Sequence, residues 1–166
     1  MPPGGGTWYA TTAAISSDGS GVAEKELVTF GYITETALGA RVMIYSMVTG
    51  ALLTDYVSPV NAQLQTYPTV RMSGNYAGVC LWGDNDDVPT VILMSAKSAK
   101  PIFTYTTPGS MFGIDVVHDV GASTPTNDVV YIAAAGKHVP ANESECGGTL
   151  FEHSPSPIPP PPPTAA

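Results

Sequence analysis

The stretch that decides the fold is "RVMIYSMVTGALLTDYVSP", residues 41–59. Residues typical of strands flank a polar break that contains glycine, so we predict a strand, a turn of two or three residues and a second strand. A similar stretch, "TVILMSAKSAKPIFTYTTPGS", returns at residues 90–110, and in the alignment Thr54 corresponds to Thr104. The chain therefore contains an internal repeat.

The repeat extends outward from these two hairpins. The segment "YPTVRMSGNYAGVCLW" (67–82) is followed one period later by "MFGIDVVHDVGASTPTNDVVYIAAAG" (111–136). Both read as strand, polar turn and a strand of small apolar residues, and residues 9–33 form the same unit one period earlier, with Ser-Asp-Gly as the turn. The period of about 50 residues is in the range of propeller blades.

Val, Ile, Tyr, Thr and Phe dominate the predicted strands, and Gly, Pro, Asn, Asp and Ser separate them. No long window keeps a helical period, so the sequence predicts an all-β chain. The expected strands are 10–15, 26–33, 41–47 and 51–57 in the first unit, 67–72, 76–82, 89–95 and 101–106 in the second, and 111–117, 128–135 and 149–152 in the third.

The second strand of a unit is apolar at consecutive positions, as in "GVCLW" and "VVYIAAA". This pattern predicts strands buried on both faces, as in the inner layers of stacked sheets. The small residues Ala77, Gly78 and 133–136 would let neighbouring sheets approach closely. The two stretches at 41–59 and 90–110 are then equivalent outer hairpins of successive four-stranded sheets.

With these motifs the chain resembles the β-propeller superfamily, most closely the WD40-like and PQQ-like (quinoprotein-like) repeats. "SSDGSG" and "MSGNYAGVCLW" resemble the turn of such blades, and "VMIYSMVTGALLTDY" and "VILMSAKSAKPIFTY" resemble their hairpin. The resemblance covers residues 10–136. The chain lacks the Trp-Asp and Gly-His dipeptides of such repeats, and Ala96–Lys100 replaces the usual turn glycine. The resemblance implies a partial propeller of about three four-stranded antiparallel blades; a two-sheet β-sandwich is the alternative.

The expected organisation has three parts. Residues 1–9 are a flexible N-terminal segment, residues 10–152 hold the repeats (10–59, 60–109 and 110–152), and residues 153–166 are a Pro-rich tail or linker. Because propellers close with four to eight blades, we expect a fragment of a longer propeller or one part of an assembly that completes the ring, with self-association.

Charge and composition limit the partners and the location. A net charge of −8 with six Lys and Arg argues against nucleic acid, and no apolar run approaches the about 18–20 residues that span a bilayer. The Pro tract, an extended polyproline II segment, resembles glycosylated extracellular linkers of plant and algal type, and Asn142 begins a glycosylation sequon. We expect an extracellular or cell-surface location, with a cytoplasmic one as the alternative.

The loop "GDNDDVP" (83–89) holds a candidate metal site in Asp84, Asp86 and Asp87. Ca²⁺ takes six to eight oxygen ligands, and this loop supplies at most four side chains. We expect an exposed turn whose Asp and Asn side chains bond the local backbone, with the Ca²⁺ site as the alternative. No other cofactor is expected.

No motif nominates a catalytic residue. In a strand, Asp115 and His118 would point to opposite faces, so they would not pair, and His138 and His153 are isolated. Cys80 is predicted to be a buried thiol; a disulfide to Cys146 would need the loop around "ESECGG" to fold back over that strand.

A ligand face could be lined by aromatic residues, since aromatic rings stack on sugars and peptides; core packing is the alternative for these residues, which are Trp8, Trp82, Tyr67 and Tyr105. We therefore predict a non-catalytic, propeller-type binding or scaffold module, part of a larger extracellular or surface protein, that mediates protein or glycan contacts. The alternative is a fragment of a quinoprotein-like or glycan-acting propeller enzyme.

Overall fold

The computed structural model describes residues 8–34, 40–58, 67–82, 89–107, 109–120, 128–138 and 145–153. Regular structure in these ranges is β-strand throughout, which confirms the all-β prediction. The strands are β1 (Trp8–Ser16), β2 (Leu27–Thr34), β3 (Ala40–Ser46), β4 (Leu52–Val57), β5 (Tyr67–Ser73), β6 (Tyr76–Trp82), β7 (Val91–Ser95), β8 (Phe103–Tyr105), β9 (Met111–Val120), β10 (Asp128–His138) and β11 (Glu145–His153).

Each predicted strand overlaps an observed one. The turn of the first hairpin is longer than predicted, with four residues, Met47–Gly50, between Ser46 and Ala51. The Gly50 N–H donates to the Ser46 carbonyl (2.9 Å), and Gly50 has a φ of 70°. A register shift between Ile44 and Tyr45 accommodates this longer turn.

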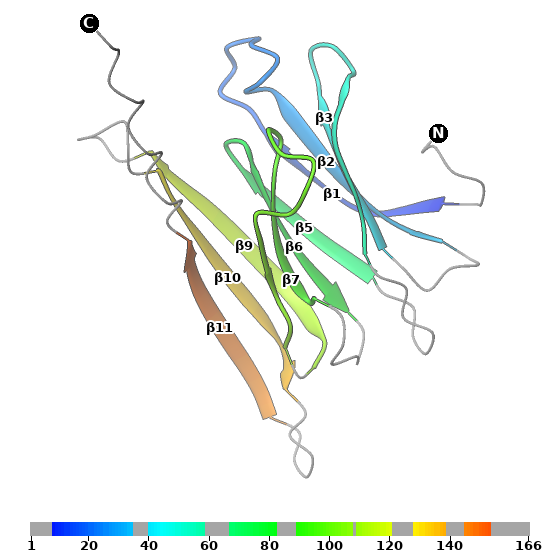
Figure 1. Ribbon diagram of the computed structural model, residues 1–166, viewed down its shortest axis with the longest axis vertical. Helices are drawn as coiled ribbons and strands as arrows, with labels where there is room; N and C mark the ends of the chain where they lie inside the picture. The colour runs from blue at the N-terminus through cyan, green and yellow to red at the C-terminus, as the bar shows by residue number, and fades with distance from the viewer. Residues whose placement is uncertain are drawn as a thin grey trace, which may run out of the picture.

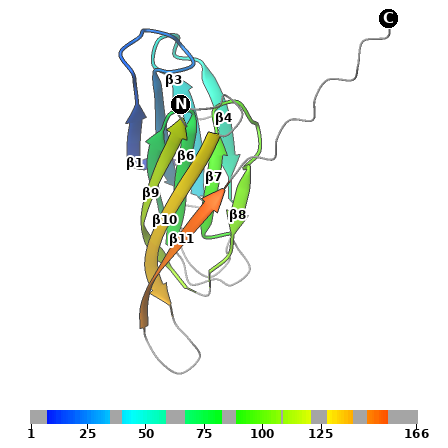
Figure 2. The same ribbon diagram turned by 90° about the vertical axis from the view of Figure 1, so that its left-hand side faces the viewer.

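The strands form three antiparallel sheets, each with its strands side by side in chain order. We name them the first sheet (β1–β4), the second sheet (β5–β8) and the third sheet (β9–β11). The second sheet lies between the other two (Figure 1): β5 contacts β1 and β2 of the first sheet, and β5 and β6 contact β9 of the third. In Figure 2, β1 and β9 lie along one edge of the stack and β4 and β8 along the other.

Two apolar clusters form the core, one on each side of the second sheet. The cluster toward the first sheet contains Leu27, Ala40, Val42, Ile44, Val70, Ala77, Val79, Leu81, Ile92 and Met94. The cluster toward the third sheet contains Cys80, Val91, Leu93, Met111, Ile114, Val116, Val130, Ile132 and Ala134. Because alternate residues of a strand point to opposite faces, β6 is buried on both sides from Ala77 to Leu81, which confirms the prediction for "GVCL" but not for Trp82.

The same prediction is wrong for "VVYIAAA" on β10. Val130 and Ile132 are fully buried, whereas Tyr131 is 37% exposed and Ala133 and Ala135 are exposed. Among the described strands, only β5 and β6 make extensive contact with the third sheet, and both lie on one side of it. The outward half of the apolar run on β10 therefore has no described sheet against it.

Glycines set the spacing of the stacked sheets. A Cβ added at Gly78 would lie 3.2 Å from Ile114 Cδ1 and 3.3 Å from Val116 Cβ, which confirms the predicted close approach at this residue. A Cβ added at Gly31 would lie 2.8 Å from Pro68 Cγ. The same Cβ would lie 2.6 Å from Thr12 Cγ2 of its own sheet. At both sheet interfaces, a glycine on the second strand of one sheet thus faces the first strand of the next, at Pro68 or at Ile114 and Val116.

Candidate functional site

A cleft of about 420 Å³ lies where the three sheets present the same end. The first sheet contributes the connection between β1 and β2, the second sheet the turn between β5 and β6, and the third sheet the far part of β9. The lining residues are Ser16, Ser17, Asp18, Lys25, Gly74, Asn75 and His118. Strands far apart in the sequence therefore build one site.

The β1–β2 connection is organised by its own polar side chains. Asp18 accepts a hydrogen bond from the Ser20 N–H (3.0 Å) and forms an ion pair with Lys25 Nζ (2.9 Å). A hydrogen bond from the Ser20 side chain, followed by the Lys25 ammonium group and the Ser20 N–H, lowers the pKa of Asp18 to about 2. The buried Glu26 accepts hydrogen bonds from the Ser17 hydroxyl and the Gly21 N–H. The first wall of the cleft therefore carries a carboxylate that is ionised at neutral pH beside an ammonium group.

The β5–β6 turn consists of two residues, Gly74 and Asn75. Gly74 has a φ of 54°, in the left-handed region that a glycine adopts at little steric cost. The Asn75 carbonyl accepts a hydrogen bond from the Ala96 N–H (2.9 Å), which joins this turn to the β7–β8 connection. The second wall is thus a tight turn held by the backbone of its own sheet.

His118 forms the third wall from the inner face of β9. Its ring packs edge-on against Tyr76, with ring centroids 4.8 Å apart, and its backbone N–H donates to Ser73 Oγ (3.0 Å). A Cβ added at Gly74 would stand 2.5 Å from His118 Nδ1, so the ring fits only because residue 74 has no side chain. The sequence pattern places His118 on the face of its strand opposite to Asp115 but gives no signal that it lies beside the β5–β6 turn.

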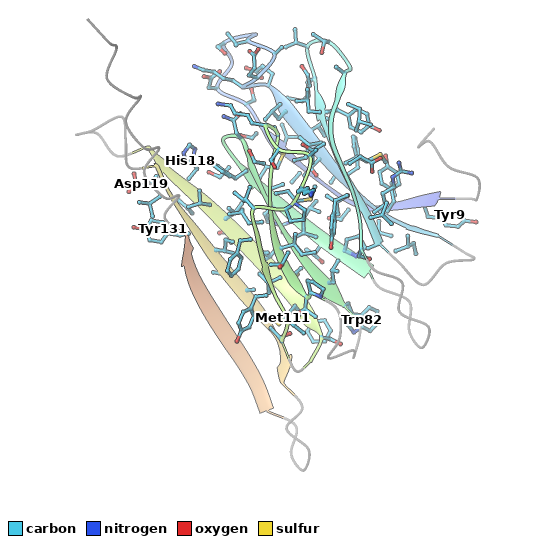
Figure 3. All side chains as sticks on the ribbon, in the orientation of Figure 1. Tyr9, Trp82, Met111, His118, Asp119 and Tyr131 are labelled. Carbon is cyan, nitrogen blue, oxygen red and sulfur yellow. The ribbon has the colours of Figure 1, made fainter. Side chains whose placement is uncertain are left out.

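Asp115 and Asp119 lie on the exposed outer face of β9, opposite to His118, as predicted for Asp115. Figure 3 shows His118 and Asp119 at the same end of that strand. Among the described residues, no group of three or more His, Cys, Asp or Glu side chains is arranged to hold a metal ion. Asp84, Asp86, Asp87 and Asn142 lie outside the described residues, as do the side chains of His138 and His153.

An aromatic pair lies at the other end of the sheets. The rings of Trp82, on β6, and Phe112, on β9, have centroids 6.1 Å apart, and the residues are 49% and 51% exposed. Figure 3 shows Trp82 far from His118. A register shift between Ala135 and Gly136 leaves Phe112 without a partner in the ladder and turns it outward.

Of the predicted aromatic residues, Trp82 and Tyr105 are exposed. The side chains of Trp8 and Tyr67 lie outside the described residues. Phe112 was missed, because nothing in "SMFGID" marks a bulge; the pairing with Gly136 on β10 creates it.

Cys80 is a free, fully buried thiol, as predicted. Burial raises its pKa to about 11, so the reactive thiolate is scarce at neutral pH. In the described part of the chain, no helix is long and apolar enough to cross a membrane. Comparisons with family models, curated proteins and solved structures found no match to this chain.

Proposed function

We propose that this chain is a non-catalytic, propeller-type binding or scaffold module of an extracellular or surface protein. Two features support the propeller-type arrangement: the internal repeat, and the stacking of three consecutive sheets whose first strands β1, β5 and β9 lie next to one another. The Pro-rich tail and the sequon at Asn142 support the location.

The observation that carries the binding function is the cleft, because each of the three sheets contributes one wall to it. Stacked repeats commonly form binding surfaces from equivalent loops at one end of the stack. A volume of about 420 Å³ falls within the range of about 300–1,000 Å³ of small-ligand sites. The lining of hydroxyl, carboxylate, ammonium, amide and imidazole groups can hold and orient a ligand.

The polar side chains of the cleft suit a glycan ligand. A sugar presents hydroxyl groups that both donate and accept, and the cleft offers both kinds of partner within one small space: Asp18 accepts, Lys25 donates, and Asn75 does either. Protein interfaces instead use a wider apolar centre with a polar rim. In the mechanism we propose, these groups bind one sugar unit at the end of a glycan without chemical change.

The test is a titration of ¹⁵N-labelled protein with defined disaccharides built from glucose, galactose, mannose or N-acetylglucosamine, followed by amide chemical shifts. We expect saturable shifts at residues 16–25, 73–76 and 118. Lys25→Met keeps the apolar stem of the side chain but removes its ammonium group, and should weaken binding at least about tenfold, the loss of one charged hydrogen bond.

Lys97→Met is the matched control, since Lys97 is an exposed lysine outside the cleft. It should leave the affinity unchanged. If no disaccharide shifts the cleft amides, or if both lysine variants weaken binding equally, the glycan proposal is wrong. Binding of a peptide at the Trp82–Phe112 pair instead would favour the protein-binding alternative.

A further inference from the structure

The outer face of the first sheet is rich in large apolar side chains. Cross-strand pairing places Ile15 opposite Val28, and Phe30 opposite Met43, on the side away from the second sheet. The ring centroid of Phe30 lies 6.1 Å from that of Tyr32 and 6.2 Å from that of Tyr45. Ile15 is 64% exposed. We call this surface the aromatic end face; its residues are Ile15, Val28, Phe30, Tyr32, Arg41, Met43, Tyr45, Asp55 and Val57. Arg41 and Met43 are buried within it, and Ile15 and Val57 are its exposed apolar side chains.

The outer face of the third sheet has a different character. Its central strand, β10, presents Ala133 and Ala135, which are both exposed. Beside them on β9 stand two carboxylates, Asp115 and Asp119. We call this surface the small-residue end face; its described side chains are Asp115, Val117, Asp119, Val129, Tyr131, Ala133 and Ala135.

These two faces match the two halves of the sheet interfaces inside the chain. At each internal interface, a small residue on the second strand of one sheet faces the first strand of the next: Gly31 faces Pro68, and Gly78 faces Ile114 and Val116. The small-residue end face offers Ala133 on β10, the second strand of its sheet, and the aromatic end face offers Ile15 on β1, the first strand of its sheet. The small residues of the third sheet therefore have no described bulky partners, and the bulky residues of the first sheet have no described small partners.

We propose that a second copy of this chain docks head to tail, with the aromatic end face of one copy against the small-residue end face of the other. The two like-with-like pairings fit less well. Two aromatic end faces would oppose bulky rings, and two small-residue end faces would bring Asp115 and Asp119 of both copies together. Head to tail, these carboxylates meet a face whose described charges, Arg41 and Asp55, form an ion pair.

A head-to-tail contact uses two different patches and so produces a closed ring or an open filament. With three sheets per copy, a closed pair would contain six sheets, within the four to eight blades of closed propellers. Such a ring would cover both apolar end faces of each copy, and so remove the cost of exposing them to water. This inference does not depend on the glycan cleft.

The experiment compares the sedimentation of the whole chain at low micromolar concentration with that of two variants. Ile15→Glu puts a charge on the aromatic end face, and Ala133→Glu adds bulk and charge to the small-residue end face. We expect a dimer or larger species for the wild type and a monomer for each variant. Mixing the two variants should restore a dimer, because each retains the face that the other has lost.

Val48→Glu is the matched control, since Val48 is an exposed apolar residue in the β3–β4 turn. It should associate like the wild type. Circular dichroism and thermal melting confirm that each variant is folded, and Ile15→Ser repeats the test without a charge. A monomeric wild type, association that survives either end-face variant, or two monomeric variants that stay monomeric when mixed would each overturn the proposal.

Discussion

Gly78 on β6 and Ile114 on β9 are in contact across two stacked sheets: a methyl carbon at residue 78 would lie 3.2 Å from Ile114 Cδ1. We therefore expect Gly78→Val to destabilise the protein by about 1–3 kcal/mol, the usual cost of overpacking a core. Urea denaturation measures this change.

Gly113 is the matched control for Gly78, because it also lies in a strand but a Cβ there would meet nothing within 4 Å. Gly113→Val should be neutral or stabilising, since a glycine inside a strand weakens it. If the two valine variants have the same stability, a side chain at residue 78 does not overpack the interface between the second and third sheets.

Gly74→Ala should be more costly than an alanine at another left-handed glycine. A left-handed conformation costs a non-glycine residue about 1–2 kcal/mol, and at Gly74 the new methyl would also stand 2.5 Å from His118 Nδ1. Gly50 has a φ of 70° with nothing within 4 Å of a Cβ, so Gly50→Ala should show the conformational cost alone.

A double-mutant cycle separates these two effects at Gly74. In a His118→Ala background, Gly74→Ala should cost only as much free energy of unfolding as Gly50→Ala does in the wild type. An unchanged cost in that background would show that His118 does not press on the turn.

The strands and their grouping could be predicted from the sequence because their signals are local. β-branched and aromatic runs separated by glycine, proline and small polar residues mark each strand, and the similarity of the two hairpin sequences predicts which strands are grouped together. Thus β3–β4 and β7–β8 are both outer hairpins of four-stranded sheets, as expected.

The predictions from sequence fail where burial and side-chain contacts depend on residues that are distant along the chain. The apolar run on β6 and that on β10 look alike, yet only β6 has described sheets on both sides, so Ala133 is exposed while Val79 is buried. The cleft had no local signal, because Gly74 and His118 are 44 positions apart and neither belongs to a catalytic motif. The sharp turn at Gly74 could be inferred from "SGN", but not the histidine that packs on it.

The Cys80 thiol should make the protein less stable at high pH. Burial raises the pKa of Cys80 from 9.0 to about 11. Between these values the unfolded chain releases the thiol proton and the folded chain keeps it, so the free energy of unfolding falls as the pH rises from 9 to 11. Cys80→Ala should show a shallower fall over this range.

Thiol labelling provides an independent check on Cys80. In a Cys146→Ser background, a thiol reagent at neutral pH should react with Cys80 only after unfolding in urea. Rapid labelling of the folded protein, or an identical pH dependence with and without Cys80, would contradict the buried-thiol assignment.

Thr54 and Thr104 correspond in the sequence alignment of the two hairpins but differ in their environment: Thr54 pairs with Ile44, and Thr104 pairs with Ile92. The Thr54 hydroxyl is buried and donates to the Ser95 carbonyl (2.9 Å), which joins β4 of the first sheet to the end of β7 in the second. Thr104, on β8, is exposed. Thr54→Val keeps the shape of the side chain but removes this hydrogen bond. The Ser95 carbonyl still accepts from the Ser98 N–H (3.1 Å), so the change should cost about 0.5–1.5 kcal/mol, the net value of one hydrogen bond.

Thr104→Val makes the same chemical change at an exposed site, where substitutions usually alter stability by no more than about 0.5 kcal/mol. Urea denaturation of the two variants measures how strongly the hydroxyl holds the first and second sheets together. Equal effects would mean that both threonines act only through strand propensity. A larger effect at Thr54 would locate the difference in the contact between sheets, because both threonines lie on the fourth strand of a four-stranded sheet.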